Sequence, residues 1–313
     1  CLLVSCMPMP DYLAREIDAG RYNKAIKKGD DWLLSTKANT ENIDAISQVQ
    51  RLVAVARLEQ AKQVNTLASY REFLAWSQGK SRIDDLRKEA YGRESHLYYI
   101  QRVTPQNSVA AFKAFRQKYP DAPDIGDSKR RQAELALETA LAMGHIKALR
   151  AFQMEYDDWP EATESVTKAR QHEVNLALKG VLSSQRINDF RRFRQRYGQW
   201  VEAETALKQV RTKEVALSFL LAERANSVIA FRNFQKTYTS WPEAKVTVAK
   251  ALALETALAF NAAKVSRNLP KLELFKKTYT PPEWQTKVDH EIALLVLGPI
   301  VTAINAKQLP PSA

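Results

Sequence analysis

The stretch Phe190–Tyr197 (FRRFRQRY), followed by the turn Gly198–Ala203 (GQWVEA), decides the fold because both segments recur along the chain. The last four copies of the aromatic motif start at 149, 190, 231 and 272, in equal steps of 41 residues. Steps of that regularity identify an internal structural repeat. The copies begin at Tyr70, Phe112, Leu149, Phe190, Phe231 and Leu272, and the turn tryptophans are Trp159, Trp200 and Trp241.

Each repeat has the pattern of two helices. The aromatic residues of one copy, Phe112, Phe115 and Tyr119, fall at i, i+3 and i+7, which is one face of an α-helix. In two turns a proline followed by glutamate, at Pro160 and Pro242, suits the first turn of a second helix. A hairpin with one apolar stripe per helix buries both stripes only by stacking on its neighbours. We therefore predict an all-α, αα-hairpin solenoid of about six to seven repeats.

A second motif, Glu-x-x-Leu, accompanies the first. In the three best copies, the glutamate lies 17 residues before the next aromatic motif. This constant offset predicts a second fixed position in the repeat. The glutamates are Glu94, Glu134, Glu173, Glu214, Glu255 and Glu291.

Composition limits the class of protein. The 313 residues include 47 basic and 35 acidic side chains, for a net charge of +12. Charged residues make up 26% of the chain, and the mean hydropathy is −0.40, which excludes a polytopic membrane protein. Only nine glycines argue against turn-dense all-β folds and glycine-rich dinucleotide-binding enzymes. The basic excess favours an acidic partner.

Both cysteines, Cys1 and Cys6, lie within the first six residues. The residues Leu3, Val4 and Ser5 before Cys6 resemble the lipobox of bacterial lipoproteins. The resemblance implies lipidation of Cys6, secretion, and attachment to the periplasmic face of the outer membrane, since no aspartate follows the cysteine. Two alternatives stay open: Cys1 is the acylated end, or the sequence starts inside a buried helix.

Two further segments resemble known helical repeats. Gly20–Ile26 (GRYNKAI) is similar to the opening of the second helix of a tetratricopeptide repeat. Phe112–Pro123 (FKAFRQKYPDAP) resembles the divergent repeats of bacterial envelope lipoproteins, and the resemblance implies other envelope proteins as partners. A 41-residue unit exceeds the usual ~34 residues of that repeat and approaches HEAT-type repeats.

These patterns divide the chain into four parts. Residues 1–10 form a signal-peptide remnant and tether, and residues 11–65 form tetratricopeptide-like helices. Residues 66–300 hold the repeated hairpins, and residues 301–313 form a cap and tail. The apolar run 292–304 is interrupted by Gly298 and Pro299, so we expect the last repeat helix to be followed by a separate cap.

The sequence offers little for catalysis. The four histidines are dispersed, and neither His172-Glu173 nor His290-Glu291 has a second histidine four residues after the first, so the zinc-protease pattern fails. The adjacent acidic pairs lie at helix starts or turns, and no glycine-rich phosphate loop is present. We expect no enzymatic activity, cofactor, metal or small-molecule substrate.

The repeated cations are the candidate binding residues. One basic residue follows the first aromatic of five copies, and a second stands three residues later in three copies. Stacked repeats would align these cations as a partner-binding stripe, or as a solvated face that only keeps the protein soluble. We expect reversal of three of these charges, at Arg150, Arg191 and Arg232, to leave melting nearly unchanged. The stripe comprises Arg71, Lys113, Arg150, Arg191, Arg232, Arg116, Arg194 and Lys276.

Two functions compete. The first is a lipid-anchored periplasmic scaffold that holds proteins of an envelope assembly, secretion or motility complex. The second is a basic binder of an anionic surface or polymer, such as membrane headgroups or cell wall. Nucleic acid is a partner only for a cytosolic protein, which the lipobox argues against.

Overall fold

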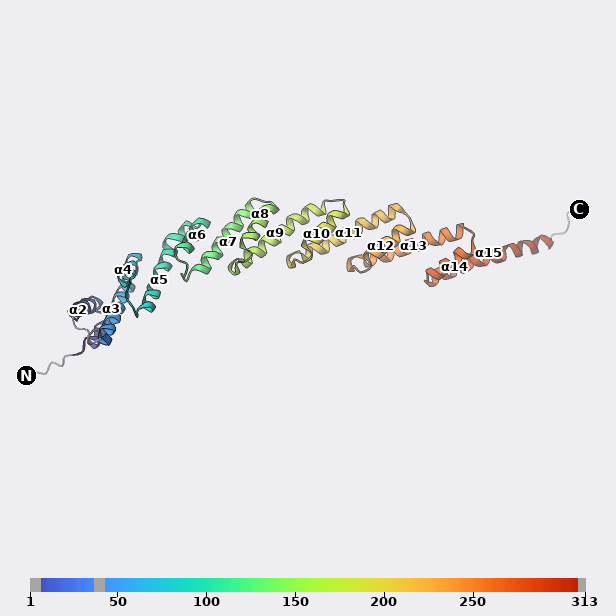
Figure 1. Ribbon diagram of the computed structural model, residues 1–313. Helices are drawn as coiled ribbons and strands as arrows, with labels where there is room; N and C mark the ends of the chain where they lie inside the picture. The colour runs from blue at the N-terminus through green and yellow to red at the C-terminus, as the bar shows by residue number, and fades with distance from the viewer. Residues whose placement is uncertain (1–6, 37–42, 309–313) are drawn as a thin grey trace, which may run out of the picture. The chain divides into compact units, whose positions relative to one another are not determined.

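The computed structural model describes residues 7–36 and 43–308, and these residues contain fifteen α-helices and no strand. Helix accounts for 84% of the structure (Figure 1). The prediction of an all-α helical-hairpin solenoid is confirmed. Cys1 and Cys6 lie outside the described residues, so the lipidation of either remains a prediction.

From residue 67 onward, short and long helices alternate as six hairpins. In the most regular copies the short helix has 11 residues and the long helix 20 to 22. The pairs are α4 (Leu67–Ser77) with α5 (Asp84–Tyr98), α6 (Val109–Lys118) with α7 (Ile125–Ala142), α8 (Ile146–Tyr156) with α9 (Thr163–Leu182), α10 (Ile187–Tyr197) with α11 (Glu204–Ala225), α12 (Val228–Tyr238) with α13 (Lys245–Val265), and α14 (Leu269–Thr278) with α15 (Pro282–Gln308).

Three helices precede the hairpins: α1 (Met9–Asp18), α2 (Tyr22–Thr36) and α3 (Ile43–Val64). They share one core around Leu13, Ala25 and Val53. Gly29 on α2 lies directly against Val53, because a Cβ built on this glycine would come 2.2 Å from the valine Cγ2. The glycine therefore permits close packing of α2 on α3.

Short irregular helices complete the list of elements. A π-helical turn η1 (Tyr99–Val103) and a 3-10 turn η2 (Thr104–Gln106) follow α5. In three regular hairpins a 3-10 turn opens the long helix at the tryptophan-containing turn, as the Pro-Glu pattern predicts. These are η3 (Pro160–Ala162), η4 (Val201–Ala203) and η5 (Pro242–Ala244).

One residue in the left-handed conformation connects most hairpins to the next. In unit after unit it stands immediately before the N-cap residue of the following short helix, and the cap side chain accepts a backbone N–H of the first turn. Asparagine and glycine tolerate this conformation best, although Arg267 adopts it as well. The pairs are Asn65-Thr66, Asn107-Ser108, Gly144-His145, Asn226-Ser227 and Arg267-Asn268.

In the core of each hairpin, the aromatic side chains of the short helix pack against small side chains of the long helix. Phe190, Phe193 and Tyr197 of α10, for example, are buried with Ala203 and Val210 at the start of the long helix. Small side chains recur at the closest approach, as at Ala162, Ala203 and Ala244, each fully buried. Because the aromatic residues and the alanines pack against each other in each regular hairpin, both recur every 41 residues.

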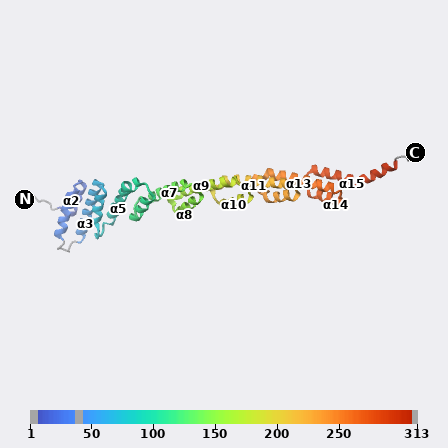
Figure 2. The same ribbon diagram turned by 90° about the horizontal axis from the view of Figure 1, so that it is seen from above.

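The chain consists of two compact units, residues 1–169 and 170–313, and the division falls within α9. In the second unit α10 lies beside α11 and α12 beside α13, as the view from above also shows (Figure 2). The same alternation runs through α4 to α8 of the first unit.

The carboxyl end differs from the prediction of a helix followed by a separate cap. α15 continues through Gly298 and Pro299 to Gln308 as one helix of 27 residues. A proline inside a helix removes one backbone hydrogen bond and crowds the preceding turn. Gly298 has open space around its Cα and Pro299 is exposed, so the helix accommodates both.

Candidate partner-binding surface

A buried glutamate joins three consecutive helices in the second unit. Glu255 on α13 is 3% exposed and accepts hydrogen bonds from Arg232 at 2.8 Å and Gln235 at 2.6 Å, both on α12. The Tyr279 hydroxyl, at the end of α14, donates to the same carboxylate at 2.7 Å. A buried carboxylate needs such partners to offset its lost hydration. This glutamate, with its cation and its tyrosine, forms what we call the inter-repeat clamp.

The same clamp recurs one repeat earlier. Glu214 on α11 is paired with Arg194 at 2.9 Å and Arg191 at 3.6 Å, both on α10. The Tyr238 hydroxyl on α12 donates to it at 3.3 Å. Glu173 on α9 likewise accepts from Tyr197 on α10 at 3.0 Å.

The first unit contains two versions of the clamp. Glu94 on α5 accepts from Arg71 on α4 and from the Tyr119 hydroxyl, both at 2.8 Å. In the next repeat a neutral residue takes over, since the Gln132 side chain on α7 accepts from Arg116 at 2.7 Å and donates to the Tyr156 hydroxyl at 3.0 Å. The clamp therefore requires a polar acceptor at this position, and a charge is optional.

Two glutamates assigned to the second motif do not occupy this position. Glu134 is exposed and pairs with Arg130 within its own helix, whereas Gln132 is the residue in the clamp. Glu291 pairs with Lys264 at 2.6 Å and meets no tyrosine. The spacing to leucine misled the assignment, because the separation between the clamp residue and the next tyrosine defines the clamp: 24 residues in four copies, and 25 residues between Glu94 and Tyr119.

Burial and the clamp both act on the tyrosines. Burial, and then the hydrogen bond to Glu94, raise the pKa of Tyr119 to about 12. Burial also raises the pKa of Tyr238, and burial together with the Glu255 hydrogen bond raises that of Tyr279. These hydroxyls therefore remain protonated donors well above neutral pH.

The structure places most of the predicted stripe in these clamps. Arg71, Arg191 and Arg232 are each about half exposed, yet each pairs with a buried glutamate. The positive charge of these arginines therefore stabilises the buried glutamates and is only partly available to a binding partner. Arg150 on α8 is exposed and also has an interaction partner. Lys113 on α6 is exposed and has no acidic partner among the residues described.

The second row of cations is oriented differently. Arg116 and Arg194 point toward the following hairpin, where each guanidinium lies over the tryptophan in the turn of that hairpin. The distances to the ring centroids are 5.0 Å for Arg116 and Trp159 and 4.6 Å for Arg194 and Trp241. Lys276 stays exposed and pairs with Asp289 at 2.5 Å. Trp159 and Trp241 therefore contact the hairpin that precedes their own.

The ion pairs of the clamps change the expectation that charge reversal in the stripe leaves the melting temperature nearly unchanged. Charge reversal at Arg191 and Arg232 would set a new carboxylate beside a buried one, so melting will not stay unchanged. The cations most available to a partner are those outside the clamps.

Sequence reasoning missed the clamp. The constant separation of 23 residues from Arg71 to Glu94 and from Arg232 to Glu255 is the sequence signal that could have revealed it.

A second inter-repeat ion pair links consecutive long helices. Glu161, in the turn before α9, accepts from Lys129 on α7 at 3.1 Å. Glu243, in the turn before α13, accepts from Arg211 on α11 at 2.9 Å. The glutamate of the Pro-Glu turn therefore binds the preceding repeat as well as opening its own helix.

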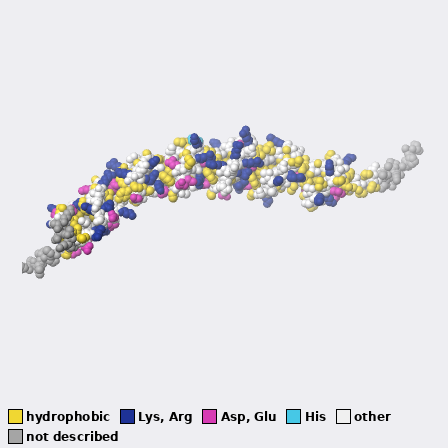
Figure 3. Space-filling model, in the orientation of Figure 1, with side chains coloured by type: hydrophobic (Ala, Val, Ile, Leu, Met, Phe, Trp, Pro, Cys, Tyr) yellow, Lys and Arg dark blue, Asp and Glu magenta, His cyan; other side chains and the backbone are white. Residues whose placement is uncertain are grey.

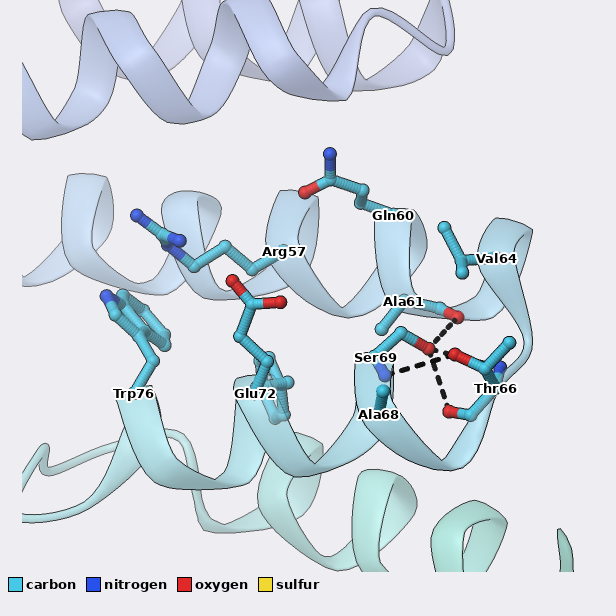
Figure 4. A pocket seen from close by; sticks show the side chains of 10 residues that line it. Arg57, Gln60, Ala61, Val64, Thr66, Ala68, Ser69, Glu72 and Trp76 are labelled. Carbon is cyan, nitrogen blue, oxygen red and sulfur yellow. Dashed lines mark hydrogen bonds between the residues drawn. The ribbon is translucent and has the colours of Figure 1, made fainter.

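A hollow of about 310 Å³ lies between α3 and α4 in the first unit (Figure 4). The Arg57 guanidinium lies 4.7 Å from the Trp76 ring and donates to Asp30 at 2.5 Å. Ser69 caps α4 together with Thr66 and reaches the Ala61 carbonyl at 3.1 Å. The Arg57 Nη2 and Ser69 hydroxyl groups are therefore held by neighbouring groups of the fold, whereas the buried Arg57 Nε has no hydrogen-bond partner among the described residues.

Two of the four histidines hold structural positions. His145 is the N-cap of α8, where Nδ1 accepts the Ala148 N–H at 3.1 Å. His96 Nδ1 lies 3.0 Å from the Asp124 carboxylate at the start of α7. Over residues 7–36 and 43–308, no group of three or more His, Cys, Asp or Glu side chains could hold a metal ion.

The net charge is unequally divided. Residues 170–313 contain 22 basic and 12 acidic side chains, a net charge of +10, whereas residues 1–169 contain 25 and 23, a net charge of +2. Lysine and arginine side chains gather over α10 in the space-filling view (Figure 3). Three arginines of that region, Arg186, Arg192 and Arg196, are exposed and stand outside the clamp.

One stretch of the described residues, Pro242–Val265, is long and apolar enough to cross a membrane by length and composition alone. It comprises η5 and α13, which pack against α12 and α14 and hold the ion-paired Glu255. We therefore assign this stretch to the solenoid core.

The sequence matches no known protein family, and no curated protein is significantly similar to it. The fold itself defines the class, an all-α solenoid of helical hairpins.

Proposed function

We propose that this protein is a non-enzymatic scaffold of a bacterial envelope, anchored through a lipid on Cys6 at the periplasmic face of the outer membrane, which binds other envelope proteins. The observation that carries the proposal is the clamp, because it holds consecutive hairpins in register and leaves their outer faces for partners. Solenoids with such repeated interfaces commonly present extended binding surfaces. The lipobox-like residues before Cys6 support the anchor, and the divergent tetratricopeptide-like repeats support envelope partners.

The anchor is tested by producing the protein from its natural gene in a Gram-negative host and measuring intact mass. A diacylglycerol-plus-acyl adduct on Cys6, with the protein in the outer-membrane fraction, is the expected result. The matched control is Cys6→Ser. An unmodified cytosolic product would refute both the anchor and the compartment.

Partner binding is tested by cross-linking in intact cells followed by mass spectrometry. We expect a small, reproducible set of envelope proteins, which is reduced by Lys113→Glu or by joint Arg192→Glu and Arg196→Glu substitution. These side chains lie outside the clamp, so the variants should fold normally. An unchanged set of cross-linked proteins would remove these cations from the binding surface.

A second candidate function rests on the charge of residues 170–313. A net charge of +10 favours binding to an anionic surface or polymer, such as membrane headgroups or cell wall. Purely electrostatic binding of this kind weakens steeply as salt rises, whereas a packed protein interface responds less. A shift of duplex DNA at 150 mM salt, with no protein partner captured, would favour the second function over the scaffold.

A further inference from the structure

The last long helix lacks the neighbour that every regular long helix before it has. In α11 and α13, one face packs on the helices before it, and the opposite face packs on the next short helix. On α13 that forward face includes Phe260, whose ring lies 5.5 Å from Phe275 of α14, and Glu255, which binds Tyr279. On α11, Phe219 and Phe234 stand in the same relation at 5.4 Å.

α15 has a backward face but no partner for its forward face among the described residues. Ile292 and Leu295 pack on the core formed with α14, and Leu295 and Gly298 border a hollow that also includes Leu272. At 100° per residue, Leu297 and Ile300 lie about 160° and about 140° from Leu295, on the opposite side of the helix, and Val296 lies at the edge of that side. That side is where α13 carries its next short helix.

The forward face is apolar and open. Val296, Leu297 and Ile300 are 47%, 54% and 53% exposed. No charged residue occurs from 292 to 306, and hydrophobic side chains cover much of α15 before the grey atoms in the space-filling view (Figure 3). A contiguous apolar surface of this kind marks an interaction site rather than an ordinary solvated face.

The repeat itself indicates what fits. Each forward face within the regular hairpins receives one helix with an aromatic residue or leucine at i and aromatic residues at i+3 and i+7, such as Phe231, Phe234 and Tyr238 of α12. We propose that the forward face of α15 binds one amphipathic helix of a partner protein, presented in the same way as a further repeat would present its short helix. This inference rests on the proposed scaffold function and names the surface and the chemistry of its partner.

The chemistry at the third anchor distinguishes this partner from an internal repeat. Within the four glutamate clamps the tyrosine hydroxyl donates to the buried carboxylate, and in the fifth clamp the Gln132 side chain donates to the Tyr156 hydroxyl. α15 has no acidic residue after Glu291, so a tyrosine buried there would lose its acceptor. The partner helix should therefore bear phenylalanine or leucine at that position.

A second copy of this chain cannot supply such a helix from its surface. Every phenylalanine, tyrosine and tryptophan of the chain is buried or half-buried, and the exposed large hydrophobic side chains are aliphatic or methionine. The described residues of a second copy thus present no exposed aromatic side chain, and we assign the aromatic anchors to another protein.

The test uses a fluorescent peptide with the sequence of residues 226–239, the chain's own α12, carrying Tyr238→Phe. Its anisotropy is titrated with the full chain. We expect saturable binding, weakened about fivefold or more when the peptide keeps Tyr238, and abolished by Phe231→Ala with Phe234→Ala. Equal binding of the phenylalanine and tyrosine peptides would overturn the assignment of the third anchor.

Protein variants locate the site. Leu297→Glu and Ile300→Glu replace exposed side chains, so their melting should match the parent, and each should weaken peptide binding about tenfold or more. The matched control is Ile229→Glu, since Ile229 is equally apolar and exposed but lies on α12. Peptide binding unaffected by the α15 variants would overturn the proposal.

Other occupants give different outcomes. A concentration-dependent dimer in sedimentation, dispersed by Leu297→Glu, would show a second copy at this face instead. Co-sedimentation with neutral phosphatidylcholine vesicles, lost in the same variant, would show a membrane instead. If the peptide fails to bind while cross-linking in cells still captures envelope proteins, the scaffold stands and this surface is wrong. If both fail, the scaffold itself is wrong.

Discussion

Glu255 and Tyr279 are joined by a 2.7 Å hydrogen bond, although they belong to consecutive hairpins and are 24 residues apart. The carboxylate is also bound by Arg232 of its own hairpin, so a single buried group fixes both the hairpin and its neighbour. Such a device couples the stability of adjacent repeats, because removing the carboxylate leaves partners on both sides unsatisfied.

Removing this carboxylate should therefore be costly. Glu255→Ala is expected to lower the free energy of unfolding by about 2 to 3 kcal/mol, since Arg232, Gln235 and Tyr279 lose their common acceptor. Urea titration followed by circular dichroism measures the change. Glu134→Ala, at an exposed glutamate, should change stability by less than about 0.5 kcal/mol. Equal effects of the two substitutions would contradict the clamp.

Charge reversal separates cations that stabilise the fold from those free to bind. Arg232→Glu sets a second carboxylate beside buried Glu255 and should destabilise the protein by about 1 to 2 kcal/mol, a figure reduced by the exposure of Arg232. Lys113→Glu has no such neighbour and should leave the melting temperature nearly unchanged. Differential scanning fluorimetry of the two variants gives the comparison, and identical melting would refute the distinction.

One substitution, glycine to alanine, should act with opposite sign at two helical positions. Gly29→Ala on α2 would press a methyl group against the buried Val53 and should destabilise by about 1 to 3 kcal/mol. Gly92→Ala on α5 meets no atom within 4 Å and should stabilise by about 0.5 to 1 kcal/mol through helix propensity. Urea midpoints of both variants test the pair. Stabilisation by Gly29→Ala would show that α2 and α3 pack less closely than described.

The clamp predicts a loss of stability at alkaline pH. The pKa of Tyr119 is raised to about 12 in the folded protein, above the value of about 10 for an exposed tyrosine, so the unfolded chain releases this proton first. The stabilising contribution is complete below pH ~10 and disappears as pH rises through ~12, with a change of about 2 kcal/mol.

The measurement is the urea midpoint of the parent and of Tyr119→Phe between pH 8 and pH 12. The phenylalanine variant should start less stable and lose less on the alkaline side. Tyr22→Phe serves as control, because the Tyr22 hydroxyl makes no hydrogen bond to any other described residue. Parallel pH curves for the parent and Tyr119→Phe would exclude the proposed role of this hydroxyl.

The sequence predicted the repeat well but not the ion pairs that its cations make. The spacing of Phe190, Phe193 and Tyr197 was sufficient for the short helix, because one face of a helix repeats every 3 to 4 residues. The same reasoning treated Arg191 and Arg232 as surface cations, since adjacency to a core residue says nothing about a carboxylate 23 residues away. The break expected at Gly298 and Pro299 is absent because the surrounding backbone has room for both residues.

By itself, the sequence determined the all-α class, the hairpin unit and its 41-residue period, because periodic burial within a helix is a local property written in the order of residues. Only the tertiary structure decided which charges are internal to the fold and which face of α15 is open. Those depend on which side chains from separate hairpins meet, and the desolvation of Glu255 arises only when its neighbours stack around it.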